Sequence, residues 1–229
     1  MSNMNYPECK YPRGALAIYA KAPVLGRVKT RLQGFLGEEG ALSLHKSLIR
    51  YVFENLAQAR LCATQLWVAG QADAPTYDPQ EDAFFLGLCA REAIVAQQGA
   101  DLGERMAHTA RQALTQADYV VIVGADCPSV DASYLEAALQ ALEAGASIVF
   151  GPADDGGYVL LGLRELPECL FVGVPWGSSE VLAVSRANLR ANGWQWTELE
   201  PRWDVDRPQD LVRLQALDDS FIFDSTSKA

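Results

Sequence analysis

Four basic side chains lie close together near the start of the chain, at Lys21, Arg27, Lys29 and Arg31. They flank Gly26, and glycine can adopt backbone conformations that bring amide groups close to an anion. Lysine and arginine add charge-assisted hydrogen bonds, and an arginine can hold two phosphate oxygens at once. The segment matches neither the G-x-G-x-x-G nor the G-x-x-x-x-G-K-[ST] pattern. It therefore predicts a phosphate site of another type, the alternative being a solvated basic loop.

Carboxylates in two later segments could hold a metal ion. Asp126 follows the apolar run at 119–123 and precedes Cys127 and Pro128, so we expect it at the end of a buried strand. A hard carboxylate there suits Mg²⁺ or Mn²⁺, although it could also cap the next turn. Asp204 and Asp206 point the same way if the chain is extended. Either could complete a metal site with Asp126, while Asp206 could instead start a helix.

A third segment has the composition of a turn. Asp154, Asp155, Gly156 and Gly157 separate two short apolar runs, and Tyr158 begins the second run. This order predicts a β-hairpin, which needs no function. The two carboxylates, the glycines and the aromatic ring also suit a loop that binds an acceptor molecule.

Other candidates have weaker patterns. Asp101 lies between two glycines, where it could meet an anion or a base, or could simply start a helix. Trp176 could stack on a ring or anchor a helix. His45 and His108, the only histidines of the sequence, fall in predicted helices, and no G-x-S-x-G elbow is present, which argues against a Ser-His-Asp hydrolase.

Composition narrows the functional classes. The 229 residues carry a formal net charge of -10, so binding of nucleic acid by bulk attraction is not expected. A local basic segment in an acidic chain suits a small anion better. The five scattered cysteines form no C-x-x-C pair and predict free thiols in a reducing compartment. With no signal-like or membrane-spanning run, the sequence predicts a cytoplasmic protein.

The elements that must position these residues alternate between strand and helix. Such alternation predicts an α/β fold with a mostly parallel sheet covered on both faces, and a ligand at the carboxyl ends of the strands. Apolar runs predict strands at 15–20, 65–69, 94–97, 119–123, 147–150, 158–163 and 194–198. Helical spacing predicts helices at 38–60, 102–114, 132–143, 178–191 and 208–217, with caps at Asp131 and at Ser178 or Ser179. We expect one domain over 14–217 and a tail over 218–229, in which Phe221, Ile222 and Phe223 could dock.

Taken in order, these segments resemble one family. They are 20–32, 98–106, 124–128, 151–158, Trp176 and 204–211. The set is similar to a poorly characterised bacterial glycosyltransferase-like family of the nucleotide-diphospho-sugar transferase superfamily, neighbour to phospholactate guanylyltransferase-like proteins. The resemblance implies a single Rossmann-like three-layer α/β/α domain of the GT-A type. It also implies a divalent metal, Mg²⁺ or Mn²⁺, with Asp126 and Asp206 as its ligands. The usual D-x-D of sugar transferases is replaced by Asp126-Cys127-Pro128, so the second ligand comes from a distant position.

The resemblance implies that the chain is an enzyme that uses a nucleotide-activated donor and a small acceptor. The leading hypothesis is metal-dependent glycosyl transfer from a nucleotide-diphospho-sugar. The alternatives are nucleotidyl transfer, guanylyl or cytidylyl, to a phosphorylated small acid, and nucleotide binding without turnover. Nothing in the sequence selects one nucleobase over another. The predicted sites are catalytic Lys29, Asp154 and Asp155; phosphate or nucleotide contacts Lys21, Gly26, Arg27, Lys29, Arg31 and Asp101; metal ligands Asp126 and Asp206; and acceptor contacts Gly156, Gly157, Tyr158 and Trp176.

Overall fold

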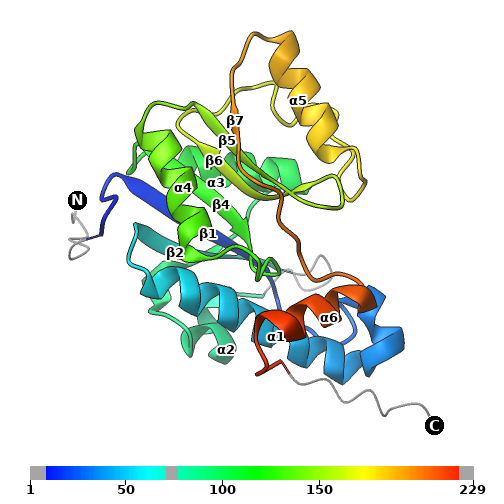
Figure 1. Ribbon diagram of the computed structural model, residues 1–229. Helices are drawn as coiled ribbons and strands as arrows, with labels where there is room; N and C mark the ends of the chain where they lie inside the picture. Colours follow the sequence, from blue (N-terminus) through cyan, green and yellow to red (C-terminus); the bar gives the residue numbers. More distant parts are fainter. Residues whose placement is uncertain (1–8, 71–76, 222–229) are drawn as a thin grey trace.

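A single seven-stranded sheet organises the chain, as Figure 1 shows for the computed structural model, which describes residues 9–70 and 77–221. The strand order is β3-β2-β1-β4-β6-β5-β7. The strands are β1 Gly14–Lys21, β2 Ala63–Ala69, β3 Ile94–Ala96, β4 Tyr119–Gly124, β5 Ile148–Pro152, β6 Tyr158–Leu163 and β7 Thr197–Glu198. The helices are α1 Gln33–Gln58, α2 Ala83–Leu86, α3 Leu102–Ala113, α4 Ala132–Glu143, α5 Val181–Ala191 and α6 Pro208–Leu217, with 3-10 turns η1 Thr30–Leu32, η2 Pro79–Glu81 and η3 Arg91–Ala93.

The sheet is mostly parallel, which confirms the predicted fold class. β1 pairs in parallel with β2 and β4, β2 with β3, and β5 with β7. β6 alone runs antiparallel, to β4 on one side and to β5 on the other, and β5 and β6 form the predicted hairpin. The chain goes from β1 toward β3 and then returns to the other side of β1 at β4. This change of direction places the switch point, where parallel α/β sheets bind ligands, between β1 and β4.

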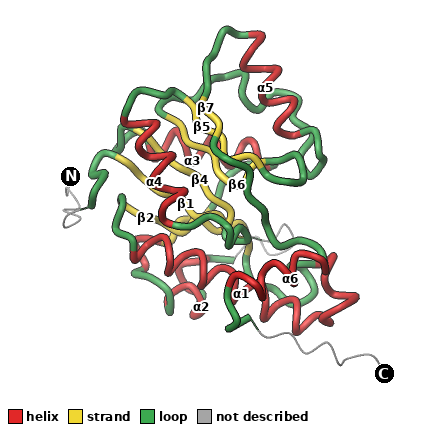
Figure 2. Tube along the Cα trace, viewed as in Figure 1, coloured by secondary structure: helices red, strands yellow, loops and turns green. Residues whose placement is uncertain are grey.

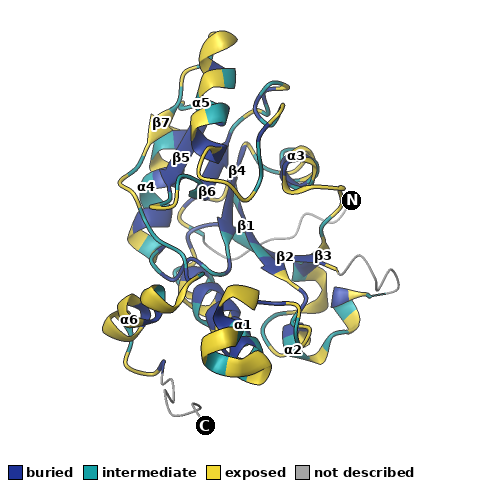
Figure 3. Cartoon of the chain, turned by 90° about the vertical axis from the view of Figure 1, so that its right-hand side faces the viewer, coloured by how far each residue is buried: buried dark blue, intermediate teal, exposed yellow. Residues whose placement is uncertain are grey.

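Helices cover both faces of the sheet, as the tube in Figure 2 shows. α1 and α4 pack on one face, and α3 and α5 on the other. Apolar side chains alternate between these two cores along each central strand; in β4, for example, Val121 and Val123 face α1 and α4, while Val120 and Ile122 face α3. The central strands are therefore buried on both faces (Figure 3), which explains their continuous apolar sequence.

Helix starts follow the predicted caps in one case and differ in another. Asp131 accepts a hydrogen bond from Tyr134 N and caps α4, as predicted. The predicted helix is present as α5, but its predicted start is wrong: it begins at Val181, and neither Ser178 nor Ser179 is its N-cap. Leu182 N donates instead to Gly156 O at 3.0 Å, so the start of α5 is tied to the β5–β6 hairpin. The late strand is also shorter than predicted, because Trp194 N bonds to Leu189 O and closes α5.

The C-terminal helix returns to α1. Leu211 and Leu214 of α6 join Leu44 and Leu48 of α1 in a small apolar cluster, and Phe221 stacks edge-on against Tyr51 at 5.3 Å. Phe221 therefore docks as expected, whereas Ile222 and Phe223 lie outside the described residues. All five cysteines are free thiols. In the part of the chain that the structure describes, every helix is too short or too polar to cross a lipid bilayer.

Candidate functional site

A cavity of about 520 Å³ opens at the carboxyl edge of the sheet, where β1 and β4 end. This volume lies in the range of pockets that hold small molecules and cofactors. Of the residues predicted from sequence, those that line it are Lys21, Arg27, Lys29, Arg31, Asp126, Asp155, Gly157, Tyr158 and Asp206, with Asp204 beside them. The switch point of the sheet, the basic loop and four carboxylates are therefore gathered around one space.

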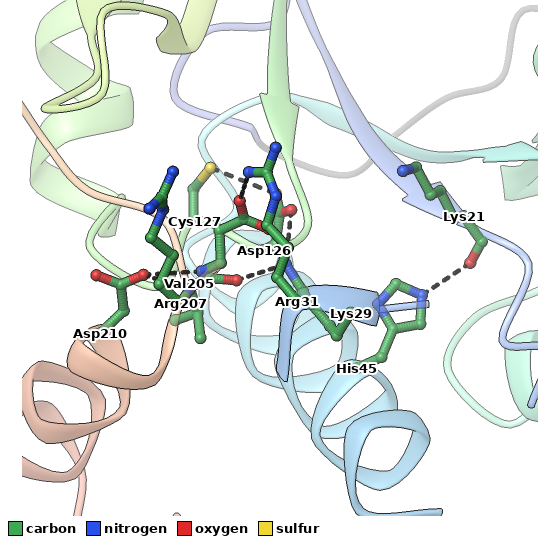
Figure 4. A network of polar contacts seen from close by, with 10 residues as sticks. Lys21, Lys29, Arg31, His45, Asp126, Cys127, Val205, Arg207 and Asp210 are labelled. Carbon is green, nitrogen blue, oxygen red and sulfur yellow. Dashed lines mark hydrogen bonds and ion pairs between the residues drawn. The ribbon is translucent and has the colours of Figure 1, made fainter. Parts of the chain in front are cut away.

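Lys29 lies at the base of this cavity. Its ammonium donates to Asp126 Oδ2 at 2.9 Å and to Val205 O at 2.6 Å, and only 6% of its side chain is exposed (Figure 4). Its backbone is left-handed, with φ 45° and ψ 44°, which costs a residue with a side chain about 1–2 kcal/mol. Strain of this kind persists where the surrounding contacts determine the conformation, and it is common at functional sites. The two contacts of the ammonium hold Lys29 in place.

Two protonation states follow from this ion pair. Burial alone would raise the pKa of Asp126, but the Lys29 ammonium outweighs burial and lowers that pKa to about 2. Burial would likewise lower the pKa of Lys29, and the Asp126 carboxylate raises it instead. Both groups are therefore charged at neutral pH. The Asp126 side chain remains 42% exposed, on the side open to the cavity.

A second ion pair joins the basic loop to the segment before α6. Arg31 donates to Asp206. The sequence left open whether Asp206 starts the helix, and the structure assigns that task to Asp210, whose carboxylate accepts from Asp206 N at 3.0 Å and Arg207 N at 2.7 Å (Figure 4). The carboxylate of Asp206 therefore lines the cavity.

The pKa of Asp204 is shifted by its surroundings in the site. Its pKa is raised to about 7, by burial first and then by the carboxylates of Asp126 and Asp155. The residue lines the cavity two positions before Asp206. Asp204 and Asp206 therefore both line the cavity, and either remains a candidate for the second metal ligand beside Asp126.

His45 closes the wall beside the basic loop. Its Nε2 donates to Lys21 O at 3.0 Å, which fixes the end of β1. Burial lowers the pKa of His45 to about 4, so the ring is neutral at physiological pH. The sequence did not predict that His45 lines the cavity, because a histidine within a predicted helix gives no such indication.

The β5–β6 hairpin separates the two predicted carboxylates. Asp155 lines the cavity and accepts from Gly157 N at 2.9 Å. Asp154 lies outside the cavity lining and pairs with Arg213 of α6 at 2.9 Å. Only Asp155 is therefore placed to meet a bound molecule.

Gly156 permits the close contact between this hairpin and the start of α5. Its φ is +92°, and a Cβ at this position would lie 2.1 Å from Ser179 O, which is backbone. We expect Gly156→Ala to lower the free energy of unfolding by about 2–4 kcal/mol, because strain and overlap coincide. Thermal or urea unfolding measures this loss. Gly173→Ala is the matched control, since Gly173 has φ +64° with no heavy atom within 4 Å of a Cβ; an equal loss in both variants would mean that the overlap is relieved.

Besides Asp154 and Gly156, three more of the predicted residues lie outside the cavity lining. Asp101 caps α3 by accepting from Glu104 N at 2.8 Å. Trp176 stacks near Phe171 and covers Gly103 of α3, so its observed contacts are those of an anchor. Gly26 has φ +74°, the conformation that favours glycine, and shapes the basic loop without lining the cavity.

Sequence reasoning also missed Tyr19, Gln97 and Arg105, which line the cavity. Tyr19 lies inside a buried strand, where nothing distinguishes it from a core residue. Arg105 lies one turn into α3 and donates through Nε to Gly99 O at 3.1 Å. Gln97 directly follows β3, and that position at a strand end was the available signal.

Comparisons with known proteins agree with this fold. The sequence profile of the family described as "Uncharacterized protein conserved in bacteria (DUF2064)" matches residues 52–178. No curated protein matches in sequence. Among solved structures, a protein from Desulfovibrio desulfuricans G20, assigned as a nucleotide-diphospho-sugar transferase, is 30% identical with a TM-score of 0.77, over 92% of this chain and 90% of that chain.

More distant structures share the fold. A cytidylyltransferase from Leptospira borgpetersenii serovar Hardjo-bovis is 14% identical with a TM-score of 0.56, over 93% of this chain and 89% of that chain. The 4-diphosphocytidyl-2C-methyl-D-erythritol synthase from Anaerococcus prevotii DSM 20548 is 8% identical with a TM-score of 0.57, over 90% and 95%. At such identities the likeness concerns the arrangement of the chain alone.

Proposed function

This chain belongs to the DUF2064 family of proteins conserved in bacteria, and from that premise we propose that it is a metal-dependent transferase that moves a glycosyl group from a nucleotide-diphospho-sugar to a small acceptor. The Lys29–Asp126 pair at the switch point is the observation that carries the proposal. It places a fixed cation and a carboxylate together at the base of a cavity that Asp155 also lines. The relative from Desulfovibrio desulfuricans G20, assigned as a nucleotide-diphospho-sugar transferase, supports the choice of donor.

The basic loop would bind the diphosphate of the donor. Lys21, Arg27 and Arg31 line the cavity together with Lys29. When the bond to the sugar breaks, negative charge grows on the departing nucleoside diphosphate. Fixed cations that face this charge stabilise the transition state, and each is worth more in a cavity than in water.

The carboxylates fit a divalent cation. Asp126, Asp204 and Asp206 supply hard oxygen donors, which Mg²⁺ and Mn²⁺ prefer, and burial together with the neighbouring carboxylates raises the pKa of Asp204. Within residues 9–70 and 77–221, no group of three or more acidic, histidine or cysteine side chains forms a ready metal cage. Asp126 with Asp206 or Asp204 would therefore hold the ion together with phosphate oxygens of the donor, a common arrangement for Mg²⁺. When bound, the ion would neutralise part of the negative charge of the phosphates.

Asp155 would orient the acceptor and take its proton. It lines the cavity from the β5–β6 hairpin, and Tyr158 and Gly157 line the wall beside it. A carboxylate within hydrogen-bond reach of a hydroxyl can act as its general base. A hydroxyl acceptor needs such a base.

Nucleotidyl transfer is the second candidate. The four cations of the basic loop that line the cavity also suit a triphosphate, whose cleavage would release pyrophosphate. An acceptor that is itself a phosphate would need no general base, so the two reactions differ in their need for Asp155.

Product analysis separates the two reactions. With Mg²⁺ and a panel of nucleotide-diphospho-sugars we expect release of nucleoside diphosphate, whereas pyrophosphate from a nucleoside triphosphate would favour the second candidate. Asp155→Asn should lower the rate of glycosyl transfer by about 10²–10⁴-fold, the usual contribution of a general base. Asp154→Asn is the matched control and should keep the wild-type rate, because Asp154 pairs with Arg213 outside the cavity lining. Equal rates in the two variants would remove Asp155 from the mechanism.

A further inference from the structure

The side chain of Gln97 crosses the ends of two strands. Its backbone N extends the ladder of β3 by donating to Val68 O at 2.9 Å. Its Nε2 donates to Trp67 O of β2 at 2.8 Å and reaches Ala20 O of β1 at 3.4 Å. The amide is thereby held across the carboxyl edge of the sheet, where it lines the cavity.

These two partners fix which way the amide faces. A backbone carbonyl oxygen can only accept a hydrogen bond, so the NH₂ group must face Trp67 and Ala20. The Oε1 atom must then face the opposite way. Among the described residues, none donates a hydrogen bond to Gln97 Oε1. Gln97 therefore offers a bound molecule one acceptor whose orientation the protein has already set.

The surroundings of this acceptor suit a flat ring. Ala20 of β1 and Ala69 of β2 line the cavity at the ends of these two neighbouring strands, and their side chains are small and apolar. The carbonyl of Ala69 already accepts from Ala22 N at 2.9 Å, and that of Lys21 from His45 at 3.0 Å. The basic loop begins directly after Ala20, so a ring placed against these residues lies next to the cations that would bind its phosphates.

We propose that Gln97 selects the nucleobase of the donor by accepting a hydrogen bond from an exocyclic amino group. This inference rests on the proposed use of a nucleotide. Cytosine, guanine and adenine carry such a group. Uracil does not, and its one edge donor, N3–H, lies between two carbonyl oxygens that would repel Oε1. The donor therefore carries an amino-bearing base, and uracil is disfavoured.

Pairs of nucleotides that differ at the amino group test the proposal. Isothermal titration with Mg²⁺ gives the dissociation constants of CDP against UDP, of GDP against IDP and of ADP against IDP. A neutral hydrogen bond of about 1–1.5 kcal/mol corresponds to about a tenfold preference, which we expect for the amino-bearing member of at least one pair. In Gln97→Met, which keeps the length of the side chain and loses the acceptor, this ratio should fall to about one.

The ratio distinguishes selection of the base from a purely structural role of Gln97. Loss of the bonds to Trp67 and Ala20 would weaken both members of a pair equally and leave the ratio unchanged. Gln98→Met is the matched control, because Gln98 is exposed and lies outside the cavity lining, and it should keep the wild-type ratio. Binding without an amino preference, or a preference that survives in Gln97→Met, would overturn this inference alone. Failure of every nucleotide to bind would overturn the proposed function and this inference with it.

Discussion

Replacement of Lys29 by methionine should lower kcat/KM for transfer by about 10²–10³-fold, the effect of removing one fixed donor from a developing negative charge. The ammonium is almost fully buried, and Lys29 adopts a left-handed backbone at the start of η1. The variant also leaves the Asp126 carboxylate and Val205 O without their shared donor. We expect a loss of about 1–2 kcal/mol in the free energy of unfolding, measured by urea denaturation.

Lys10→Met is the matched control for this prediction. Lys10 also pairs with a carboxylate, Glu136, but its side chain is 60% exposed and lies outside the cavity lining. Exposed pairs contribute little to stability, so neither the rate nor the unfolding curve should change measurably. If Lys29→Met kept kcat/KM within tenfold of the wild-type value, the role assigned to Lys29 would be wrong.

Asp126→Asn should abolish the part of nucleotide binding that depends on metal, and should lower turnover by about 10³-fold. Asparagine keeps the shape of the side chain but removes the charge that attracts Mg²⁺ and the counter-ion of Lys29. Titration of CDP or GDP with and without Mg²⁺ measures the first effect. The expected result is that the variant binds equally under both conditions.

Asp118→Asn controls for the loss of one acidic charge. Asp118 pairs with Arg13 just before β4 begins, and its side chain lies outside the cavity lining. It should retain the metal dependence of the wild type. Retention of that dependence in Asp126→Asn as well would mean that the ion binds elsewhere.

Much of this architecture could be predicted from the sequence, because strands buried on both faces have continuous apolar runs. One such run extends from Tyr119 to Val123, and the structure confirms that it forms β4. Asp126 could be placed at the end of that strand for the same reason. The predicted start of α5 was wrong because the first turn of the helix is fixed by a tertiary contact, from Leu182 N to Gly156 O, and not by a serine cap.

The pairing within the site could not be predicted. That Lys29 meets Asp126, and Arg31 meets Asp206, depends on bringing together residues separated by 97 and 175 positions. Adjacent residues also differ: Asp154 and Asp155 look alike in sequence, but the turn between β5 and β6 places one against α6 and the other in the cavity. The roles of Gln97 and His45 depend on carbonyl groups, which carry no sequence signal.

The central claim is that the cavity between β1 and β4 binds a nucleotide together with a divalent metal. A thermal-shift panel tests it most directly, with nucleoside diphosphates, nucleoside triphosphates and nucleotide-diphospho-sugars, each with and without Mg²⁺ or Mn²⁺. A ligand at a hundred times its dissociation constant adds about 2.7 kcal/mol of stability, or roughly 5–10 °C in Tm for a chain of this size. We predict such a shift for at least one nucleotide, larger with metal and much reduced in Lys29→Met. An unchanged Tm with every nucleotide, in the presence and absence of metal, would contradict the claim.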